Sequence, residues 1–581
     1  MVANSLTELA RTIMRTFADV GVEDVVVSPG SRSTPFVVAA VREPRLRCHS
    51  IIDERAAAFF ALGRARVTQR PTVLLCTSGS AAAHYFPAVV EAAMAYVPLV
   101  VLTADRPPEL HDCHAPQTID QVKIYGDYAR HFFDLVPQPT AAALRGARRV
   151  IAQAVLASRF PLAGPVHVNA RASKPLEPAV ATTPEEKTFA EIASAIREEP
   201  VTAAYEMVAQ PSSEAIAKCA ELVSRAQRGL VVCGPAPLRQ KSAREAIASL
   251  ARATGFGVWA EATSQLRFCG EGGQLDALDL VWRTNAGRAR LLPDLVVQIG
   301  APPISNAWEA IAAPIPRVVL AESGWQDPWS SARVIAFGDP AASAAALAAA
   351  VKKTPPQPSD HAEALASANA RAWKCVDEAV DRTFGEGAAT RVIVSRAPRG
   401  SLLFVGNSLS VRLVDTYCPS TSNDLGVLSQ RGASGIDGLV AGAVGASLAS
   451  NEPVTLLVGD VSLLHDVSSL SLARRVRSPL VVVVLNNRGG RIFEQLPLAR
   501  ATGIEKPILD LTLTPHDVDF AKAAALYDVP FARARTRDEL SVALDAAYAS
   551  GGPTLVEVTV PDHGAAALQN EIIAALQSAL V

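Results

Sequence analysis

The sequence predicts an α/β protein built from three consecutive doubly wound parallel-sheet domains. Its length of 581 residues is too great for one hydrophobic core and corresponds to roughly three or four domains. Short apolar runs alternate with helical patterns along the chain, as expected for parallel sheets covered by helices. Two stretches rich in proline and polar residues, 174–200 and 354–360, interrupt this alternation and are interpreted as connectors.

The first domain is predicted at residues 1–178. A helical pattern opens it, since charged side chains are spaced among apolar ones over residues 5–17. Apolar runs then predict strands at 25–27, 50–52, 72–76, 99–102 and 166–168.

The second and third domains are predicted at 205–353 and 360–581. The second has candidate strands at 230–233, 258–259, 295–299 and 318–320, and an Ala-rich helix at 341–351. The third has candidate strands at 402–405, 454–458, 480–485 and 555–560, with a helical segment at 468–476.

Composition limits the class of protein. The 49% hydrophobic content indicates a well-buried globular chain, and a net charge of −2 gives no basic footprint for nucleic acid. The eight cysteines include no Cys-x-x-Cys pair, as is common in a reducing cytoplasm. No apolar run is long enough to span a bilayer, and the N-terminus lacks the apolar core of a signal peptide. We therefore expect a cytoplasmic protein without nucleic-acid partners or membrane insertion.

Two strand ends in the third predicted domain carry oxygen ligands. The run 454–458 ends in Gly-Asp460, and the run 480–485 ends in Asn-Asn487. The carboxyl ends of parallel strands open on one edge of a sheet, so these two side chains are expected side by side. Carboxylate and amide oxygens suit Mg²⁺. Either residue alone is more typical of a turn former, and it is the pair that favours a metal site.

Glu54 stands where a strand pattern gives way to a helical one at 56–67. Acidic residues in a first helical turn are common because the helix dipole favours them, so Glu54 alone favours a capping role. The alternative is a catalytic carboxyl whose pKa is raised in an apolar pocket, so that it can give and take a proton.

Four turn-rich segments each hold an arginine beside glycine, serine or proline. They are residues 28–35, 103–110, 406–412 and 430–438, and they carry Arg32, Arg106, Arg412 and Arg431. Loop arginines are usually just solvated. Four of them near predicted strand ends indicate a polyanionic ligand, since arginine binds carboxylates in bidentate fashion.

Two further patterns are interpreted as structural. His111-Asp-Cys113-His114 lacks the second ligand pair of a zinc site and is expected to be a polar loop. The glycines at 438, 442 and 445 are expected in a helix, where they permit close packing and form no dinucleotide fingerprint.

Together these motifs resemble thiamine-diphosphate enzymes and, among them, the SEPHCHC synthases of menaquinone biosynthesis (SEPHCHC is 2-succinyl-5-enolpyruvyl-6-hydroxy-3-cyclohexene-1-carboxylate). The Gly-Asp and Asn-Asn pairs follow the superfamily signature, with Val461 where the general pattern has glycine. The closer resemblance lies in the first and third predicted domains, at residues 28–35, 77–80, 103–110, 406–415, 431–438, 459–462 and 486–497.

The resemblance implies a transferase that forms a carbon–carbon bond. Such an enzyme decarboxylates 2-oxoglutarate with thiamine diphosphate and adds the resulting succinyl carbanion to isochorismate, giving SEPHCHC and CO₂ in menaquinone or phylloquinone biosynthesis. Both substrates are dicarboxylates, which suits four arginines. The alternatives are another thiamine-diphosphate 2-oxo acid decarboxylase, an acetolactate-synthase-like enzyme, or a non-catalytic ligand-binding homologue.

The resemblance also implies roles for individual residues. Glu54 would be the catalytic acid at the cofactor pyrimidine, and Asp460, Asn487 and the Gly489 carbonyl would bind Mg²⁺ or Mn²⁺. Cofactor contacts would come from Ile436, Gly459, Asp460, Val461, Ser462, Asn487, Ile492 and Phe493. Substrate contacts would come from Ser31, Arg32, Arg106, Gln117, Ser408, Arg412, Arg431, Phe493 and Leu496. In this family each site combines two chains, so a homodimer or a dimer of dimers is expected.

Overall fold

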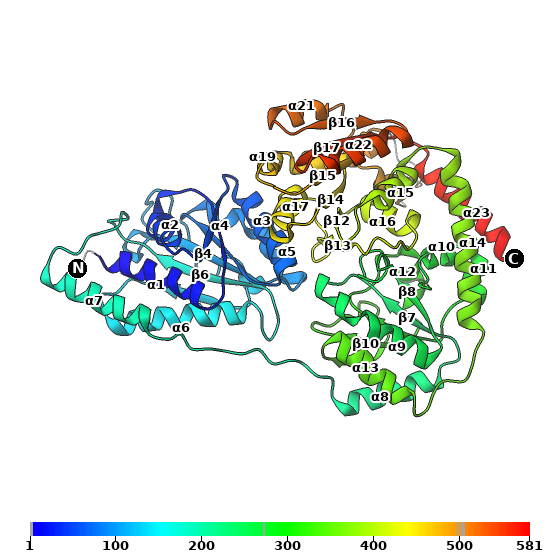
Figure 1. Cartoon of the computed structure of the whole chain (residues 1–581), viewed down its shortest axis with the longest axis horizontal. Coiled ribbons are helices and arrows are strands. Elements are labelled where there is room, and N and C mark those ends of the chain that lie inside the picture. The colour runs from blue at the N-terminus through cyan, green and yellow to red at the C-terminus, as the bar shows by residue number, and fades with distance from the viewer. Residues whose placement is uncertain (1–3, 271–272, 497–498, 500, 502–505) are drawn as a thin grey trace. The chain divides into compact units, whose positions relative to one another are not determined.

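A computed structural model describes residues 4–270, 273–496, 499, 501 and 506–581 (Figure 1). Pro497, within the motif at 486–497, lies outside the described residues. The chain divides into two compact units, which are described separately. Unit 1 comprises Met1–Met207, Gln430–Ser450 and Ser468–Arg475, and unit 2 comprises Val208–Ser429, Asn451–Val467 and Val476–Val581.

Unit 1 contains one parallel sheet with the strand order β2-β1-β3-β4-β6-β5. Its strands are β1 (Asp24–Val27), β2 (Arg47–Ser50), β3 (Thr72–Cys76), β4 (Leu99–Asp105), β5 (Phe132–Leu135) and β6 (Pro165–Arg171). The interior strands β1, β3, β4 and β6 are buried along their whole length, because helices cover both faces of such a sheet. Helix α1 (Ser5–Asp19) packs on α6 (Ala141–Ala157) and α7 (Pro184–Glu198).

Helix α3 (Glu54–Thr68) packs closely on α17 (Leu439–Ser450) within unit 1. A Cβ atom added to Gly63 of α3 would lie 2.0 Å from the carbonyl oxygen of Gly442 in α17. One added to Gly445 would lie 2.1 Å from the carbonyl oxygen of Phe60. Only glycine allows the two backbones to approach this closely, so the prediction of close helix packing is confirmed for Gly442 and Gly445. Gly438 was expected in the same helix but lies in the turn before α17, with a φ of +64°.

Unit 2 contains two parallel sheets, ordered β11-β10-β9-β7-β8 and β13-β12-β14-β15-β17-β16. The strands of the first are β7 (Gly229–Cys233), β8 (Gly257–Ala260), β9 (Leu295–Ile299), β10 (Arg317–Ala321) and β11 (Ala332–Phe337). Those of the second are β12 (Leu402–Val405), β13 (Gly426–Ser429), β14 (Val454–Gly459), β15 (Leu480–Asn486), β16 (Phe531–Ala534) and β17 (Pro553–Thr559). One continuous apolar core joins residues of both sheets to the long helix α14 (His361–Arg382).

Three parallel sheets flanked by helices confirm the predicted α/β fold class. The domain boundaries at 178, 205, 353 and 360 stay predictions. The connector predicted at 174–200 was wrong in part, because α7 occupies residues 184–198. Phe189, Ala193 and Ile196 recur at helical spacing there and are buried against α1 and α6.

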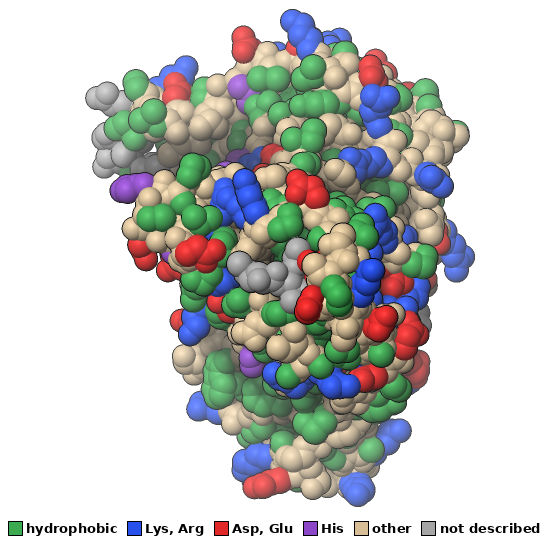
Figure 2. All heavy atoms as spheres, turned by 90° about the vertical axis from the view of Figure 1, so that its left-hand side faces the viewer, with side chains coloured by type: hydrophobic (Ala, Val, Ile, Leu, Met, Phe, Trp, Pro, Cys, Tyr) green, Lys and Arg blue, Asp and Glu red, His purple; other side chains and the backbone are tan. Residues whose placement is uncertain are grey.

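The helix predicted at 468–476 is shorter than expected. Helix α19 spans only Leu470–Ala473, and α18 (Asp460–His465) begins directly at the end of β14. Within the described residues, no helix combines the length and apolar character needed to cross a membrane. Basic and acidic side chains are interspersed on the face shown in Figure 2, in keeping with the small net charge.

Candidate functional site

Asp460 and Asn487 lie next to each other in unit 2, as predicted. Strands β14 and β15 pair in register, with Gly459 opposite Leu485, so both chains leave the sheet at the same edge. The backbone N–H of Asn487 donates to Asp460 Oδ2 at 3.1 Å. The sequence therefore brings one carboxylate and one carboxamide together, while their role as metal ligands stays a proposal.

Backbone groups hold the Asp460 carboxylate firmly. Its Oδ1 accepts from the Val461 N–H at 2.7 Å, and its Oδ2 also accepts from the Gly489 N–H at 3.0 Å. Burial raises the pKa of Asp460, and these N–H donors oppose that rise because they stabilise the charged form. His516, which the sequence analysis missed, places Nε2 3.3 Å from Asp460 Oδ2.

Asn487 has a second partner that the sequence analysis also missed. Its Nδ2 donates to Glu386 Oε1, at the start of α15 (Glu386–Arg396), and both side chains are buried. Burial raises the pKa of Glu386, and the hydrogen bond from Asn487 opposes that rise. The only signal in the sequence was an acid opening a helical segment, and this signal also fits an ordinary helix cap.

The donor set fits a divalent cation. Asn487 Oδ1 is buried and has no hydrogen-bond partner among the described residues, so this oxygen is available to coordinate a cation. Gly489 has a φ of +147°, and a Cβ there would lie 2.6 Å from the Leu513 carbonyl oxygen. This backbone path therefore requires glycine. A carboxylate, an amide oxygen and an adjacent backbone carbonyl are the hard ligands that Mg²⁺ and Mn²⁺ accept.

The apolar residues predicted beside the cofactor are not core residues. Ile492 and Phe493 belong to the short 3₁₀ helix η6 (Arg491–Gln495), which has no fully buried residue, and Leu496 is 40% exposed. An apolar side chain that the fold leaves uncovered is available to a ligand.

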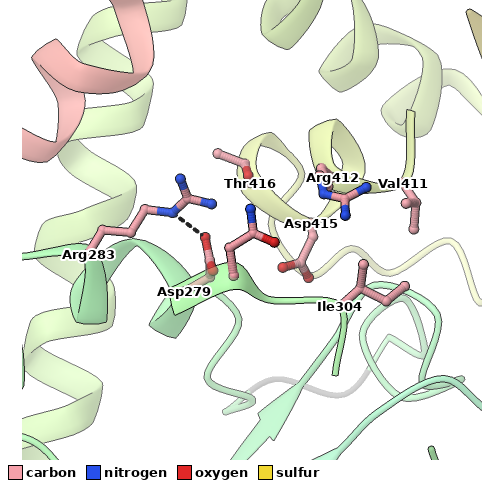
Figure 3. A pocket seen from close by; sticks show the side chains of 8 residues that line it. Asp279, Arg283, Ile304, Val411, Arg412, Asp415 and Thr416 are labelled. Atoms are coloured by element: carbon pink, nitrogen blue, oxygen red, sulfur yellow. Dashed lines mark hydrogen bonds and ion pairs between the residues drawn. The ribbon is translucent and has the colours of Figure 1, made fainter. Parts of the chain in front are cut away.

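Arg412 lies in a polar pocket of unit 2 (Figure 3). It belongs to helix α16 (Leu409–Tyr417), so the expectation that it sits in a loop was wrong. Its Nη1 donates to the Ser408 carbonyl oxygen at 2.7 Å, and burial lowers its pKa. Figure 3 shows the other labelled wall residues, which come from α10 (Leu278–Arg283), α16 and the segment before α12 (Asn306–Ala312): Asp279, Arg283, Ile304, Val411, Asp415 and Thr416.

The pocket is electrostatically mixed. Arg283 Nε pairs with Asp279 Oδ2 at 2.7 Å. Burial raises the pKa of Asp415 to about 6, although the nearby positive charge of Arg267 opposes the shift. Arg412 keeps further N–H donors beyond its bond to Ser408, and such donors suit a carboxylate group.

Glu54 and Asp53 have different roles at the start of α3 in unit 1. Asp53 is the N-cap, since its Oδ1 accepts from the Arg55 N–H at 2.9 Å and the Ala56 N–H at 3.3 Å. The Glu54 carboxylate is half-buried and makes no hydrogen bond within the described part of the chain. Burial, and to a smaller extent the negative charge of Glu54, raises the pKa of Cys76, so Glu54 lies near that buried thiol. The capping role therefore belongs to Asp53.

The predicted substrate loops of unit 1 are joined by hydrogen bonds. Gln117 accepts from the Ser78 hydroxyl at 3.0 Å through its carbonyl oxygen, and its Nε2 donates to the Ser78 carbonyl oxygen at 3.2 Å. Arg106 Nη2 donates to the Pro116 carbonyl oxygen at 2.8 Å. Arg32 is buried and donates to the Ala172 carbonyl oxygen at 2.6 Å, whereas its neighbour Ser31 is exposed.

The loop that carries Arg431 and Ile436 is fixed by a residue that the sequence analysis missed. Glu91, on α5 (Phe86–Met94), accepts from the Gly432 N–H at 3.0 Å and from the Ala433 N–H at 2.6 Å. The same buried carboxylate pairs with Arg66. Glu91 looks in the sequence like any acid within an amphipathic helix, because Gly432 and Ala433 lie 341 and 342 positions away.

Two family models and several named relatives match this chain. Residues 7–124 match the family model "Thiamine pyrophosphate enzyme, N-terminal TPP binding domain", and residues 415–558 match "Thiamine pyrophosphate enzyme, C-terminal TPP binding domain". A 2-succinyl-5-enolpyruvyl-6-hydroxy-3-cyclohexene-1-carboxylate synthase of Sorangium cellulosum is 46% identical, over 96% of this chain and 93% of its own length. Proteins of the same name from Geobacillus kaustophilus and Halobacterium salinarum are 39% and 38% identical, each over 96% of this chain and 95% and 96% of their own lengths.

Proposed function

Because this chain belongs to the 2-succinyl-5-enolpyruvyl-6-hydroxy-3-cyclohexene-1-carboxylate synthase family of thiamine-diphosphate enzymes, we propose that it makes the compound for which the family is named. In this reaction 2-oxoglutarate loses its C1 carboxylate as CO₂. The remaining succinyl unit forms a carbon–carbon bond to isochorismate, as a step of menaquinone or phylloquinone biosynthesis.

The observation that carries the proposal is the oxygen cluster at the ends of β14 and β15. Asp460 is held by three backbone N–H groups, and the buried oxygen of Asn487 has no partner within the described residues. A divalent cation, Mg²⁺ or Mn²⁺, would be bound by these two residues and the Gly489 carbonyl, and it would hold the cofactor diphosphate. Gly459, Val461 and Ser462 adjoin this cluster and would contact the same group.

Thiamine diphosphate, when bound, supplies the electron sink that makes loss of CO₂ feasible. Glu54 would hold and return the proton on the cofactor's pyrimidine nitrogen, and its carboxylate is not committed to capping α3. Ile436, Ile492, Phe493 and Leu496 would exclude water from the reacting carbon, which favours loss of a charged carboxylate.

The arginines would bind the carboxylates of the two substrates. Arg412 lies in a pocket that Arg283 also lines, and Arg431 is on a loop that Glu91 fixes. Arg32, Arg106, Ser31, Gln117 and Ser408 would complete the contacts. A charge-assisted bond to a partly desolvated arginine contributes about 1.5–3 kcal/mol, so several together would select dicarboxylates over monocarboxylates.

We also propose that the enzyme is a homodimer or a dimer of dimers, with sites shared between chains, and that it acts in the cytoplasm. The assembly rests on family membership and on the placement of Glu54 and Asp460 in different units. The cytoplasmic location rests on the eight cysteines, all of them unpaired thiols.

A substrate comparison tests the function. The purified protein, with Mg²⁺ and thiamine diphosphate, is incubated with isochorismate and either 2-oxoglutarate or pyruvate. We expect the SEPHCHC adduct and one CO₂ per adduct from 2-oxoglutarate, and no product when thiamine diphosphate is omitted. Preferred use of pyruvate would indicate an acetolactate-synthase-like enzyme, and failure to turn over either 2-oxo acid would indicate a non-catalytic homologue.

A further inference from the structure

Two neighbouring asparagines at the end of β15 are each bonded to a buried glutamate, and their oxygens differ. Asn486 Nδ2 donates to Glu557 Oε1 at 2.7 Å, and Asn486 Oδ1 accepts from the Arg488 N–H at 3.1 Å. Asn487 Nδ2 donates to Glu386, but Asn487 Oδ1 has no partner among the described residues. Both the nitrogen and the oxygen of the Asn486 amide therefore have a protein partner, whereas only the nitrogen of the Asn487 amide has one.

The glutamates differ in the same way. Glu557 uses its second oxygen to accept from Arg533 Nε at 2.8 Å. The second oxygen of Glu386 is buried and has no partner within the described residues. The Asn486–Glu557 pair is therefore complete as a structural unit. In the Asn487–Glu386 pair, only the two atoms that bond to each other have partners. Buried polar atoms usually have hydrogen-bond partners, so the unpartnered oxygen of Asn487 points to a ligand.

The contact with Glu386 decides which end of the amide faces the cluster. A carboxylate accepts hydrogen bonds, so the Asn487 NH₂ group must face Glu386 and the carbonyl oxygen must point away from it. If the Asn487 amide were reversed, its oxygen would face a Glu386 oxygen, and its NH₂ group would point toward the proposed cation site. An NH₂ group cannot bind a cation.

We propose that Glu386 is a positioning residue that holds the Asn487 amide with its oxygen directed to the divalent cation, an inference that rests on the proposed metal site. Outer partners of this kind fix the orientation of metal ligands, and their loss costs about 10–100-fold in metal affinity. In this proposal Glu386 acts on the cation through the amide of Asn487.

Titration with Mn²⁺ in the presence of thiamine diphosphate, followed by the electron paramagnetic resonance signal of free Mn²⁺, measures the effect without turnover. Glu386→Leu removes the acceptor and should weaken Mn²⁺ binding about 10–100-fold. Glu386→Gln can turn its own amide oxygen toward Asn487 and should bind Mn²⁺ within about threefold of the wild type. Glu557→Leu is the matched control, because it removes the partner of Asn486. It should lower the melting temperature and leave Mn²⁺ affinity unchanged.

If Glu386→Leu fails to fold, a second pair of variants still tests the proposal by exchanging the hydrogen-bond donor of Asn487 with the acceptor of Glu386. Asn487→Asp alone places two carboxylates against each other and should weaken Mn²⁺ binding about tenfold or more. Adding Glu386→Gln supplies a hydrogen-bond donor to the carboxylate introduced by Asn487→Asp and should restore most of the affinity.

The outcomes separate the two proposals. If the wild-type protein binds no Mn²⁺, the metal site itself is refuted and the role of Glu386 with it. If the wild type binds Mn²⁺ but Glu386→Leu binds equally well, or the exchanged pair binds no better than Asn487→Asp alone, only the positioning role is refuted.

Discussion

The two regions that carry the proposed chemistry are organised in opposite ways. In unit 2, three backbone N–H groups bind the Asp460 carboxylate, and Glu386 accepts a hydrogen bond from the amide of Asn487. In unit 1, the Glu54 carboxylate makes no hydrogen bond within the described residues, although Asp53 beside it makes two. The residues of the proposed metal site are therefore held in place by the protein alone, whereas the proposed catalytic acid has no such hydrogen bonds.

This difference follows from the two tasks. A cation site gains from rigid ligands, because ordering them in advance leaves less entropy to be lost on binding. A proton-transferring carboxyl must change its charge during the reaction, and strong bonds from protein donors would fix it in the ionised form. Substitutions in the two regions should therefore damage different properties.

Glu54→Gln should have the largest effect. Glutamine has nearly the same shape but cannot exchange a proton with the pyrimidine nitrogen, so kcat should fall about 10²–10⁴-fold while thiamine-diphosphate affinity stays unchanged. Steady-state kinetics with calorimetry of cofactor binding measures both. Asp53→Ala is the control next to it: it should cost about 0.5–2 kcal/mol of stability as a lost helix cap and keep most of the turnover. Near-normal turnover by Glu54→Gln would remove the catalytic role.

Asp460→Ala should have the opposite signature. Loss of a charged ligand should raise the thiamine-diphosphate and Mg²⁺ concentrations needed for half-maximal activity about tenfold or more. Asp519→Ala, an exposed aspartate of the same unit that caps α21 (Phe520–Leu526), should leave these concentrations unchanged. Unchanged cofactor affinity in Asp460→Ala would exclude Asp460 from the metal site.

Arg412→Ala and Arg431→Ala should have smaller effects, and on the substrates alone. Each should lower kcat/KM for at least one of the two dicarboxylates about 10–150-fold, the equivalent of about 1.5–3 kcal/mol. Arg396→Ala removes a surface arginine of unit 2 that pairs with Asp545, and it should change neither constant. If Arg412→Ala and Arg431→Ala both have wild-type kinetics, these arginines do not bind the substrate carboxylates.

The sequence predicted the buried centre of each sheet and failed at five of the six sheet edges; the exception is β8, which was predicted at 258–259. Interior strands such as β3, β9 and β12 have the predicted bounds because they are continuous apolar runs. The missed strands β5, β11, β13 and β16 and the displaced β2 all lie at sheet edges. Four of these five are partly exposed, so their sequences mix polar and apolar residues and resemble loops.

The same limit applies to the site. The sequence could predict that Asp460 and Asn487 lie together, because each follows a strand of the same sheet. The register of β14 and β15 then brings the ends of these two strands next to each other. Glu386 and Glu91 could not be found, because their partners are 101 and 341 positions away and no local pattern marks those contacts. The residues proposed to bind a ligand carry recognisable motifs, whereas Glu386 and Glu91 are found only from their contacts in three dimensions.

Mixing the Glu54 and Asp460 variants, at cofactor and Mg²⁺ concentrations too low for Asp460→Ala to be active, tests the central claim most directly: that one site needs Glu54 from one chain and Asp460 from another. Glu54→Gln and Asp460→Ala chains are co-expressed or refolded together, and subunit exchange is confirmed separately. In a mixed dimer both lesions fall in one site and the other site is intact. Half the dimers are mixed, so roughly a quarter of wild-type activity should return. No return of activity despite confirmed exchange would contradict the claim, because every site in the mixture would then carry a lesion.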